Sequence, residues 1–547
     1  MTTKIILGAG TINSNLMKYF GNINSTKVPL SSKPSILSQI EKFINKFDLV
    51  LVISSYDSYT KNLVQEFFPE VSIAEVQPIL KISDSILSGL KFASQQEDIV
   101  EILFSDTITN VANLSLDSFV AANYEKNADW TMASFTESET IFYDKKNESD
   151  GNLAVVGEFS FSDKFLLQRI CENLTNSKNL VNDDLKYILE NYNLYRRLKP
   201  IIIEKESWFD LGSLNGYQDA RKNLSLLREF NSLKISNVSN HIIKSSVNRE
   251  KILDEISWYE NLDTSAIKIT PNVIASESVK EIKYEMEWID FPTLAEFQLS
   301  GIENINFWKT MLNSLDEFLL NLHRPSPPQE ARKVIKNNLD IFLIKTIKRI
   351  EDFRYQFYNA RSNIYYENLL NISDENISVM LRNLNEKIPP FVEALNQTVA
   401  QIHGDLIFSN IFYDPADNKF LCIDPRGRWG NYRTVFGNPI YDFAKLSQSM
   451  LGKYDFVSAN LFRIDKEQIQ ISDFRSKEFL EDLNKEFISF FNRNLSRYEL
   501  DIRTVRQTEC LLWLSLASMH SENPRRQIFA FRTGYLMWRE LWMDDNG

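Results

Sequence analysis

The segment between residues 401 and 424 gathers the oxygen-bearing side chains that phosphoryl transfer requires. The stretch QIHGDLIFSNIFYD contains His403, Asp405 and Asn410, and FLCID follows with Asp424. Phosphoryl transfer needs a carboxylate that orients the acceptor hydroxyl or takes its proton. It also needs oxygen ligands for the Mg²⁺ that offsets the charge of a nucleoside triphosphate. Asp405, Asn410 and Asp424 meet both needs.

A β-hairpin is expected to bring these side chains together. IFYD and FLCID are short apolar runs typical of strands, and the turn-forming residues PADNK lie between them. Pairing of the two strands returns Asp424 to a position beside Asn410. A lone aspartate in a loop more often caps or turns the chain, so the interpretation depends on the ordered set.

This ordered set resembles the protein-kinase-like small-molecule phosphotransferases, the group that holds aminoglycoside phosphotransferases and choline kinases. The resemblance implies that Asp405 is the catalytic base, that Asn410 and Asp424 bind Mg²⁺, and that ATP is the phosphoryl donor. It also implies that His403 and Asp442, the latter in GNPIYDFAKL, support the catalytic loop.

Upstream segments extend the resemblance to about residues 229–547. Lys244 in IIKSS and Glu255 in ILDEISWYENL match the phosphate-binding lysine and its glutamate partner, and KYEMEWIDF matches the hinge strand. Two features depart from the family. No glycine-rich loop precedes Lys244, so the SNVSN turn would have to serve. Pro425 and Arg426 replace the commoner acidic residue after the metal aspartate, so we expect different contacts to the acceptor or the phosphate from those in the family.

The resemblance implies an α+β fold for this half of the chain. A small β-rich N-lobe is expected at about residues 229–300, and a large helical C-lobe at about residues 301–547.

The first 228 residues alternate between strand and helix signals. KIILGAG, DLVLVISS and EILFSDT are short apolar runs separated by amphipathic helices, which predicts an α/β domain with a mostly parallel sheet and helices on both faces. GAGTIN after the first strand comes close to the dinucleotide-binding pattern GxGxxG. Asn13 stands at the third glycine, however, so that pattern is weak evidence.

Residues 4–226 resemble the sugar-1-phosphate and phosphocholine nucleotidyltransferases, which have a glycosyltransferase-A-like fold. VPLSSKPSIL places Lys33 at the family's lysine, and ILFSDT and WFDLGSLNGYQDARKNL give Asp106 and Asp210 as metal ligands. Gly8 and Gly10 would let backbone N–H groups approach phosphates, while two carboxylates hold Mg²⁺. The resemblance implies CTP, UTP or another nucleoside triphosphate as cosubstrate.

One departure leaves two readings open for this first domain. The family's glycine turn carries an arginine that stabilises the transferring phosphate, whereas TINSN has none and Lys27 is offset. Charge stabilisation is often the largest catalytic contribution, so its loss would slow transfer strongly. The domain is either an active nucleotidyltransferase or a degenerate one that binds a nucleotide, a sugar phosphate or a partner chain.

Composition narrows the classes of partner and compartment. The net charge is -12 and no Lys/Arg-rich run occurs, which argues against nucleic acid. The chain has 3 cysteines without a CxxC pair and 4 scattered histidines, which argues against disulfides and zinc sites. No apolar run is long enough to span a bilayer and no signal peptide is seen, so we expect a cytoplasmic protein. The sequence does not decide whether it forms a homo-oligomer.

Together the two halves predict a bifunctional enzyme. A kinase would phosphorylate a small hydroxyl compound, and a nucleotidyltransferase would convert the phosphate into a nucleotide conjugate, as in bacterial capsule or surface-polysaccharide biosynthesis. The alternative is an active kinase with a degenerate N-terminal domain used for binding or assembly. The sequence leaves the acceptor open. A sugar or polyol would be bound by polar groups of SENPRRQ or RGRWGNYR. An amino alcohol would be held by an aromatic cage from Trp429, Tyr432, Trp513, Trp538 and Trp542.

Overall fold

The computed structural model divides the chain into two compact units. The N-terminal unit contains Met1–Ser225 and Ser300–Ile302, and the C-terminal unit contains Leu226–Leu299 and Glu303–Gly547. The boundary expected between residues 228 and 229 lies outside the described residues. The structure describes residues 2–30, 32–77, 81–94, 98–123, 130–143, 151–176, 184–224, 232–235, 241–246, 248–263, 269–277, 282–360, 364–395 and 398–543.

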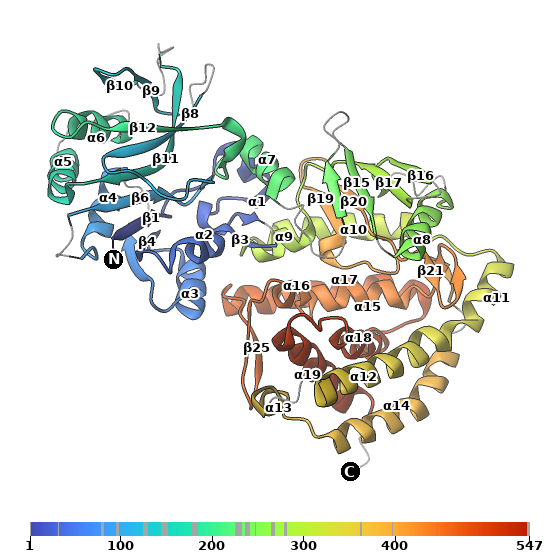
Figure 1. The fold of residues 1–547 in the computed structure, drawn as a ribbon. Helices are drawn as coiled ribbons and strands as arrows, with labels where there is room; N and C mark the ends of the chain where they lie inside the picture. Colours follow the sequence, from blue (N-terminus) through green and yellow to red (C-terminus); the bar gives the residue numbers. More distant parts are fainter. Residues whose placement is uncertain are drawn as a thin grey trace. The chain divides into compact units, whose positions relative to one another are not determined.

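A nine-stranded sheet forms the centre of the N-terminal unit (Figure 1). Apolar residues fill its central strands because both faces are covered. Parallel pairing joins four neighbouring strands in the order β6, β1, β4 and β5. The α/β prediction is therefore confirmed, and the three expected strands are β1 (Thr3–Leu7), β4 (Asp48–Ser54) and β6 (Val100–Phe104), with β5 (Ser72–Val76) added beyond them.

The other half of this sheet is mainly antiparallel, which the sequence analysis did not anticipate. β11 pairs antiparallel with β6, β8 and β9, and β10 pairs antiparallel with β9, whereas β12 runs parallel to β8. β9 and β10 are consecutive strands joined by a short connection, and such strands pair antiparallel without a crossover helix. These strands are β8 (Ser118–Asn123), β9 (Met132–Phe135), β10 (Thr140–Tyr143), β11 (Leu153–Phe161) and β12 (Lys199–Ile203).

Helices cover both faces of the sheet. On one face, Ile86 and Leu90 of α4, Leu167 of α5 and Ile188 of α6 join the buried apolar side chains of the strands, among them Ile5. α2 lies against the opposite face, where its Phe43 ring contacts Lys4 of β1. The helices of this unit are α1 (Ser14–Phe20), α2 (Ser35–Phe43), α3 (Ser58–Phe67), α4 (Ile82–Leu90), α5 (Lys164–Asn176), α6 (Asp184–Asn193) and α7 (Leu214–Leu224).

A buried ionic group lies on the second face. Lys4 on β1 and Glu101 on β6 are direct register partners, and Glu158 lies on β11. The Lys4 Nζ atom is 2.9 Å from both carboxylates and 4.0 Å from the ring centroid of Phe43 in α2. Thr109 donates a hydrogen bond of 2.7 Å to Glu158. Each charge is thus compensated inside the unit.

Lys4→Met should destabilise the chain strongly, because it leaves two buried carboxylates without their cation. We expect a loss of about 3–5 kcal/mol in the free energy of unfolding, measured by chemical denaturation. The triple variant Lys4→Met/Glu101→Gln/Glu158→Gln should recover at least half of that loss, and Lys46→Met at an exposed position should have little effect. Wild-type stability of Lys4→Met would contradict this account of the sheet.

The C-terminal unit begins with a small antiparallel sheet in the order β14-β15-β17-β16. β14 (Ser232–Ile235) and β15 (His241–Ser245) pair as an antiparallel hairpin that carries Lys244, and β17 (Ile282–Glu287) lies on the predicted hinge segment. The SNVSN turn lies outside the described residues. α8 (Arg249–Glu260) packs on the sheet through Ile252 and Ile256, and β16 (Val273–Glu277) completes the sheet.

Most of the remaining C-terminal unit is helical, which is consistent with a large helical region after a small sheet (Figure 1). All three cysteines are buried and free. Among the described residues, no helix combines the length and apolar character needed to cross a bilayer. The helices are α9 (Leu294–Leu299), α10 (Ile305–Leu322), α11 (Pro328–Lys336), α12 (Lys345–Tyr355), α13 (Ile364–Leu370), α14 (Asp374–Leu395), α15 (Ile440–Met450), α16 (Tyr454–Ser458), α17 (Lys477–Leu495), α18 (Ile502–Ala517) and α19 (Pro524–Leu541).

Candidate functional site

Lys244 is the centre of the candidate site in the C-terminal unit. Its Nζ atom lies 2.7 Å from Glu255 Oε2 on α8 and 2.8 Å from Asp424 Oδ1, which is 180 residues away in sequence. Tyr284 on β17 donates a 2.8 Å hydrogen bond to the same Glu255 oxygen. Burial opposes the charged form of Lys244, but Asp424 and Glu255 outweigh it and raise the lysine pKa. The ammonium is therefore present at neutral pH.

The predicted hairpin delivers Asp424 to this position. β19 (Ile411–Asp414) and β20 (Lys419–Cys422) pair antiparallel with Ile411 opposite Cys422, and the Ile423 N–H donates to the Asn410 carbonyl at 3.0 Å. Asp424 itself has φ 62°, in the left-handed region that non-glycine residues rarely adopt. Backbone held in such a conformation is often found at functional sites.

Asp405 and Asn410 lie together in the loop before β19. The Asn410 side-chain NH₂ group donates to the Asp405 backbone carbonyl at 2.9 Å, which leaves the Asn410 Oδ1 atom available to a cation. The Asp405 carboxylate is 40% exposed and lies 3.0 Å from the Lys445 Nζ atom of α15. Burial raises the pKa of Asp405, but Lys445 outweighs that effect, and the pKa lies below its ordinary value. Asp405 is thus an accessible, ionised carboxylate.

Asp442 on α15 holds the backbone of this loop. Its two carboxylate oxygens accept the N–H groups of His403 and Gly404 at 2.8 and 2.7 Å, and His323 Nε2 lies 3.2 Å away. Gly404 has φ +79°, and a Cβ there would come within 2.7 Å of the Arg426 Cβ. Glycine is needed at this turn because the backbone is left-handed and the space is filled.

His403 is placed as a support for the same loop. Its Nε2 atom is 2.9 Å from the Ile423 carbonyl and its Nδ1 atom is 3.3 Å from the Asp405 N–H. The first contact needs a donor and the second an acceptor, so the ring is neutral. Burial lowers the His403 pKa despite the nearby carboxylates of Asp442 and Asp405. The ring is fully buried, which keeps it away from any substrate.

Two arginines connect α8 to the loop that follows Asp424. Arg428 and Arg433 each donate from Nε to Asp254 at 2.7 Å, and both reach Glu250 at 2.9 and 3.0 Å. Because Asp254 precedes Glu255 on α8, these ion pairs fix the helix that carries the partner of Lys244.

In the N-terminal unit, strand pairing brings Asp106 and Asp210 together. β13 (Trp208–Asp210) pairs antiparallel with β7 (Thr107–Thr109), and Asp210 lies opposite Thr107. A Cβ on Gly212 would lie 2.9 Å from Asp106 Oδ2 and 3.2 Å from Asp210 Oδ1, so both carboxylates border the same glycine. Oxygen ligands of this kind suit Mg²⁺. Among the described residues, no group of three or more His, Cys, Asp or Glu side chains is arranged to hold a metal.

The glycine turn lies at the same edge of the sheet as Asp106. β1 and β6 are parallel neighbours, so Gly8 and Asp106 both follow the carboxyl ends of adjacent strands, where ligands bind in α/β sheets. A Cβ on Gly8 would come within 2.5 Å of Thr26, whereas the space around Gly10 is open. Asn13, at the place of a third glycine, instead caps α1 by accepting from Asn15 and Leu16.

The lysines near this turn already have carboxylate partners. Lys33, on the hairpin of β2 (Pro29–Leu30) and β3 (Lys33–Pro34), forms an ion pair with Glu41. Lys27 lies 3.3 Å from Asp57, whose carboxylate is fully buried. The missing arginine is therefore not replaced by an uncompensated lysine at either position.

The tryptophans considered for an aromatic cage belong to the core. Trp429, Trp513, Trp538 and Trp542 are all at most 5% exposed. Tyr432 is the fifth residue of that set, and its hydroxyl is bonded to Glu330 and Lys333. These residues form no accessible cage for a quaternary ammonium.

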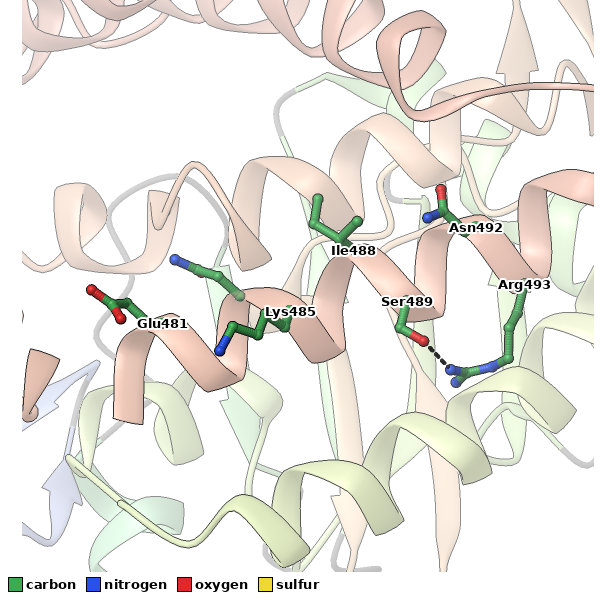
Figure 2. Close-up of a pocket in the computed structure, with 7 residues that line it drawn as sticks. Glu481, Lys485, Ile488, Ser489, Asn492 and Arg493 are labelled. Atoms are coloured by element: carbon green, nitrogen blue, oxygen red, sulfur yellow. Dashed lines mark hydrogen bonds between the residues drawn. The ribbon is translucent and has the colours of Figure 1, made fainter. Parts of the chain in front are cut away.

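A shallow pocket along α17 lies apart from these residues (Figure 2). Figure 2 shows its side chains projecting from one helix, with Arg493 donating to Ser489 at 3.0 Å. None of them is a predicted site residue. The pocket is lined by Glu481, Asn484, Lys485, Ile488, Ser489, Asn492 and Arg493.

Comparisons with known proteins concern the N-terminal region. No family model and no curated protein matches the chain. Solved structures similar to about 40% of the chain include a nucleoside-diphosphate-sugar pyrophosphorylase from Vibrio cholerae RC9 (12% identity, 40% of this chain and 100% of that chain, TM-score 0.34). The inositol-1-phosphate CTP transferase from T. maritima matches at 12% identity over 41% of this chain and 96% of that chain, with TM-score 0.33. The CTP:phosphocholine cytidylyltransferase from Streptococcus pneumoniae matches at 16% identity over 41% of this chain and 100% of that chain, with TM-score 0.34. At these TM-scores the likeness assigns no activity.

Asp442→Asn should loosen the loop that carries Asp405. An amide at this position turns a donor toward one of the two backbone N–H groups, so we expect about 1–3 kcal/mol less stability and a lower kcat. His323→Phe should cost less, because both backbone N–H groups keep their acceptor. Thermal unfolding and steady-state turnover of the two variants test this order, and equal or reversed effects would contradict it.

Proposed function

We propose that the C-terminal unit is an ATP- and Mg²⁺-dependent phosphotransferase that acts on a small hydroxyl compound. The observation that carries the proposal is the buried contact of Lys244 with both Glu255 and Asp424, next to the exposed Asp405 carboxylate. An ammonium held by two carboxylates is fixed in position and can bind phosphate oxygens.

Each residue of this site has a definable task. Asp405 is ionised and accessible, so it can orient the acceptor hydroxyl and take its proton. Asn410 and Asp424 would hold Mg²⁺, which supplies charge compensation for the triphosphate when bound. Their carboxylate and amide oxygens fit that hard cation. Lys244 would contact the donor phosphates, while Glu255 keeps its ammonium in place.

For the N-terminal unit we propose nucleotidyl transfer to the phosphorylated product, with CTP, UTP or another nucleoside triphosphate. Asp106 and Asp210 meet at Gly212 and suit Mg²⁺, and the Gly8–Gly10 turn follows the neighbouring strand. The two reactions in sequence would yield a nucleotide-activated compound. Such products suit bacterial capsule or surface-polysaccharide biosynthesis.

A second candidate is a C-terminal kinase joined to a catalytically degenerate N-terminal unit used for binding or assembly. The observation that favours it is the compensated positive charge near the glycine turn. Lys27 and Lys33 are both paired with carboxylates, and the turn contains no arginine. Without a free basic side chain to stabilise the developing negative charge, transfer would be slow.

Asp405→Asn should remove most phosphoryl transfer while leaving the fold intact. Loss of a positioned carboxylate base costs about 10²- to 10⁴-fold in kcat, measured as ADP release with Mg²⁺ and ATP over a panel of sugars, polyols and amino alcohols. Asp417→Asn, at an exposed turn of the same hairpin, is the matched control and should keep full activity. Full turnover by Asp405→Asn would falsify the assignment.

Asp106→Ala separates the two candidates for the N-terminal unit. If this unit transfers nucleotides, the wild-type chain releases pyrophosphate from a nucleoside triphosphate and the phosphorylated acceptor, and Asp106→Ala loses this release while phosphorylation continues. Absence of pyrophosphate in the wild type with all four common nucleoside triphosphates would instead support the binding role.

A further inference from the structure

Three basic side chains from three different elements surround Tyr441, beside the candidate catalytic loop. Lys345 begins α12 and donates from Nζ to the Tyr441 hydroxyl at 2.9 Å. The Arg426 guanidinium carbon, in the segment after β20, lies 5.1 Å from the Tyr441 ring centroid. Lys445 lies one turn after Tyr441 on α15 and binds Asp405. We call Lys345, Arg426, Tyr441 and Lys445 the basic cluster.

The positive charge of the basic cluster is only partly compensated. Lys445 is paired with Asp405, but within the described part of the chain no carboxylate lies at ion-pair distance from Lys345 or Arg426. Burial and the neighbouring Arg426 lower the pKa of Lys345 to about 8. Burial raises the pKa of Tyr441, but Arg426, Lys345 and Lys445 together bring it down to about 7. The lowered pKa of Tyr441, which burial alone would raise, indicates a positive local potential at its hydroxyl.

The basic cluster adjoins the carboxylate that we assign to the acceptor hydroxyl. Lys445 contacts Asp405 directly, and the Arg426 N–H donates to the His403 carbonyl at 2.9 Å. The donor phosphates have their own groups in Lys244 and the Mg²⁺ ligands. Arg428 and Arg433, from the same segment, are bound to Asp254. Among the residues that the structure describes, no carboxylate lies at ion-pair distance from Arg426.

We propose that Lys345 and Arg426 bind a carboxylate or phosphate group of the acceptor, so that the substrate of the C-terminal unit is an anionic hydroxyl compound. The inference rests on the proposed phosphotransferase function and narrows it. Neutral polyols gain nothing from the two cations, and choline or ethanolamine would be repelled by them. A guanidinium binds either anion through two parallel hydrogen bonds, which holds the acceptor in a fixed orientation.

The test compares matched acceptors with the full chain, ATP and Mg²⁺. D-Glucuronate and D-glucose 6-phosphate are set against D-glucose, and glycerate against glycerol, with choline as the cationic member. We expect the anionic member of each pair to show a kcat/KM at least tenfold higher. The glucuronate and glucose 6-phosphate arms distinguish a carboxylate from a phosphate. Equal or better use of the neutral compounds or choline overturns the proposal.

Substitutions of Arg426 and Lys345 test whether these two side chains cause the preference for anionic acceptors. Arg426→Gln and Lys345→Gln should each raise the acceptor KM by about tenfold or more through loss of a charge-assisted contact, with the KM for ATP unchanged. Arg426→Lys should retain more of the anion preference than Arg426→Gln. Lys348→Gln, an exposed lysine on the same helix α12, is the control and should match the wild type. A rise in the KM for ATP alone would assign the basic cluster to the donor and overturn the proposal.

Binding of inorganic phosphate separates failure of this inference from failure of the proposed function. Isothermal titration measures phosphate affinity of the wild type and of Arg426→Gln without any turnover. If no compound is phosphorylated but phosphate binds the wild type at least tenfold more tightly than it binds Arg426→Gln, the anion site is supported and the phosphotransferase function is contradicted. If neutral acceptors are phosphorylated and phosphate does not bind, the phosphotransferase function is supported and the anion site is contradicted.

Discussion

A buried ammonium is unfavourable unless carboxylates surround it, and Lys244 meets that condition with one carboxylate from α8 and one from the segment after β20. Three separate parts of the C-terminal unit are therefore held together by one cation. The ion pairs of Arg428 and Arg433 with Asp254, the residue before Glu255, hold α8 as well. Asp442 holds the neighbouring loop through its backbone N–H groups. The position of Asp405 depends on all of these contacts.

Positive charge is distributed unequally between the two candidate sites. In the C-terminal unit, Lys345 and Arg426 have no carboxylate within ion-pair distance among the described residues, next to a carboxylate suited to an acceptor hydroxyl. At the N-terminal site, two carboxylates converge, but the nearby Lys27 and Lys33 are each neutralised by an acidic partner. Phosphoryl transfer depends on stabilising negative charge, so of the two proposed sites the C-terminal one has the charge distribution better suited to this chemistry.

Contacts that are local in sequence were predictable, whereas contacts between distant helices were not. The PADNK turn and its flanking apolar runs were enough to pair β19 with β20 and so to place Asp424 beside Asn410. Helix and strand periodicity likewise predicted the parallel core of the first sheet. The contact of His323 with Asp442 spans 119 residues, and no pattern joins the two. Lys445, Lys345 and Tyr441 were missed for the same reason: helix packing, rather than spacing, brings Lys445 to Asp405 and Lys345 to Tyr441.

The most direct test of this account is the affinity of the Lys244 site for ATP with Mg²⁺. Isothermal titration of wild type and Lys244→Met, both in an Asp106→Ala background so that the N-terminal unit does not contribute, measures it without turnover. Lys251→Met, an i,i+4 neighbour of Glu255 with a half-exposed side chain, is the control. The account predicts at least a tenfold loss of affinity for Lys244→Met and none for Lys251→Met, with thermal unfolding showing that both remain folded. Unchanged affinity in folded Lys244→Met would contradict it.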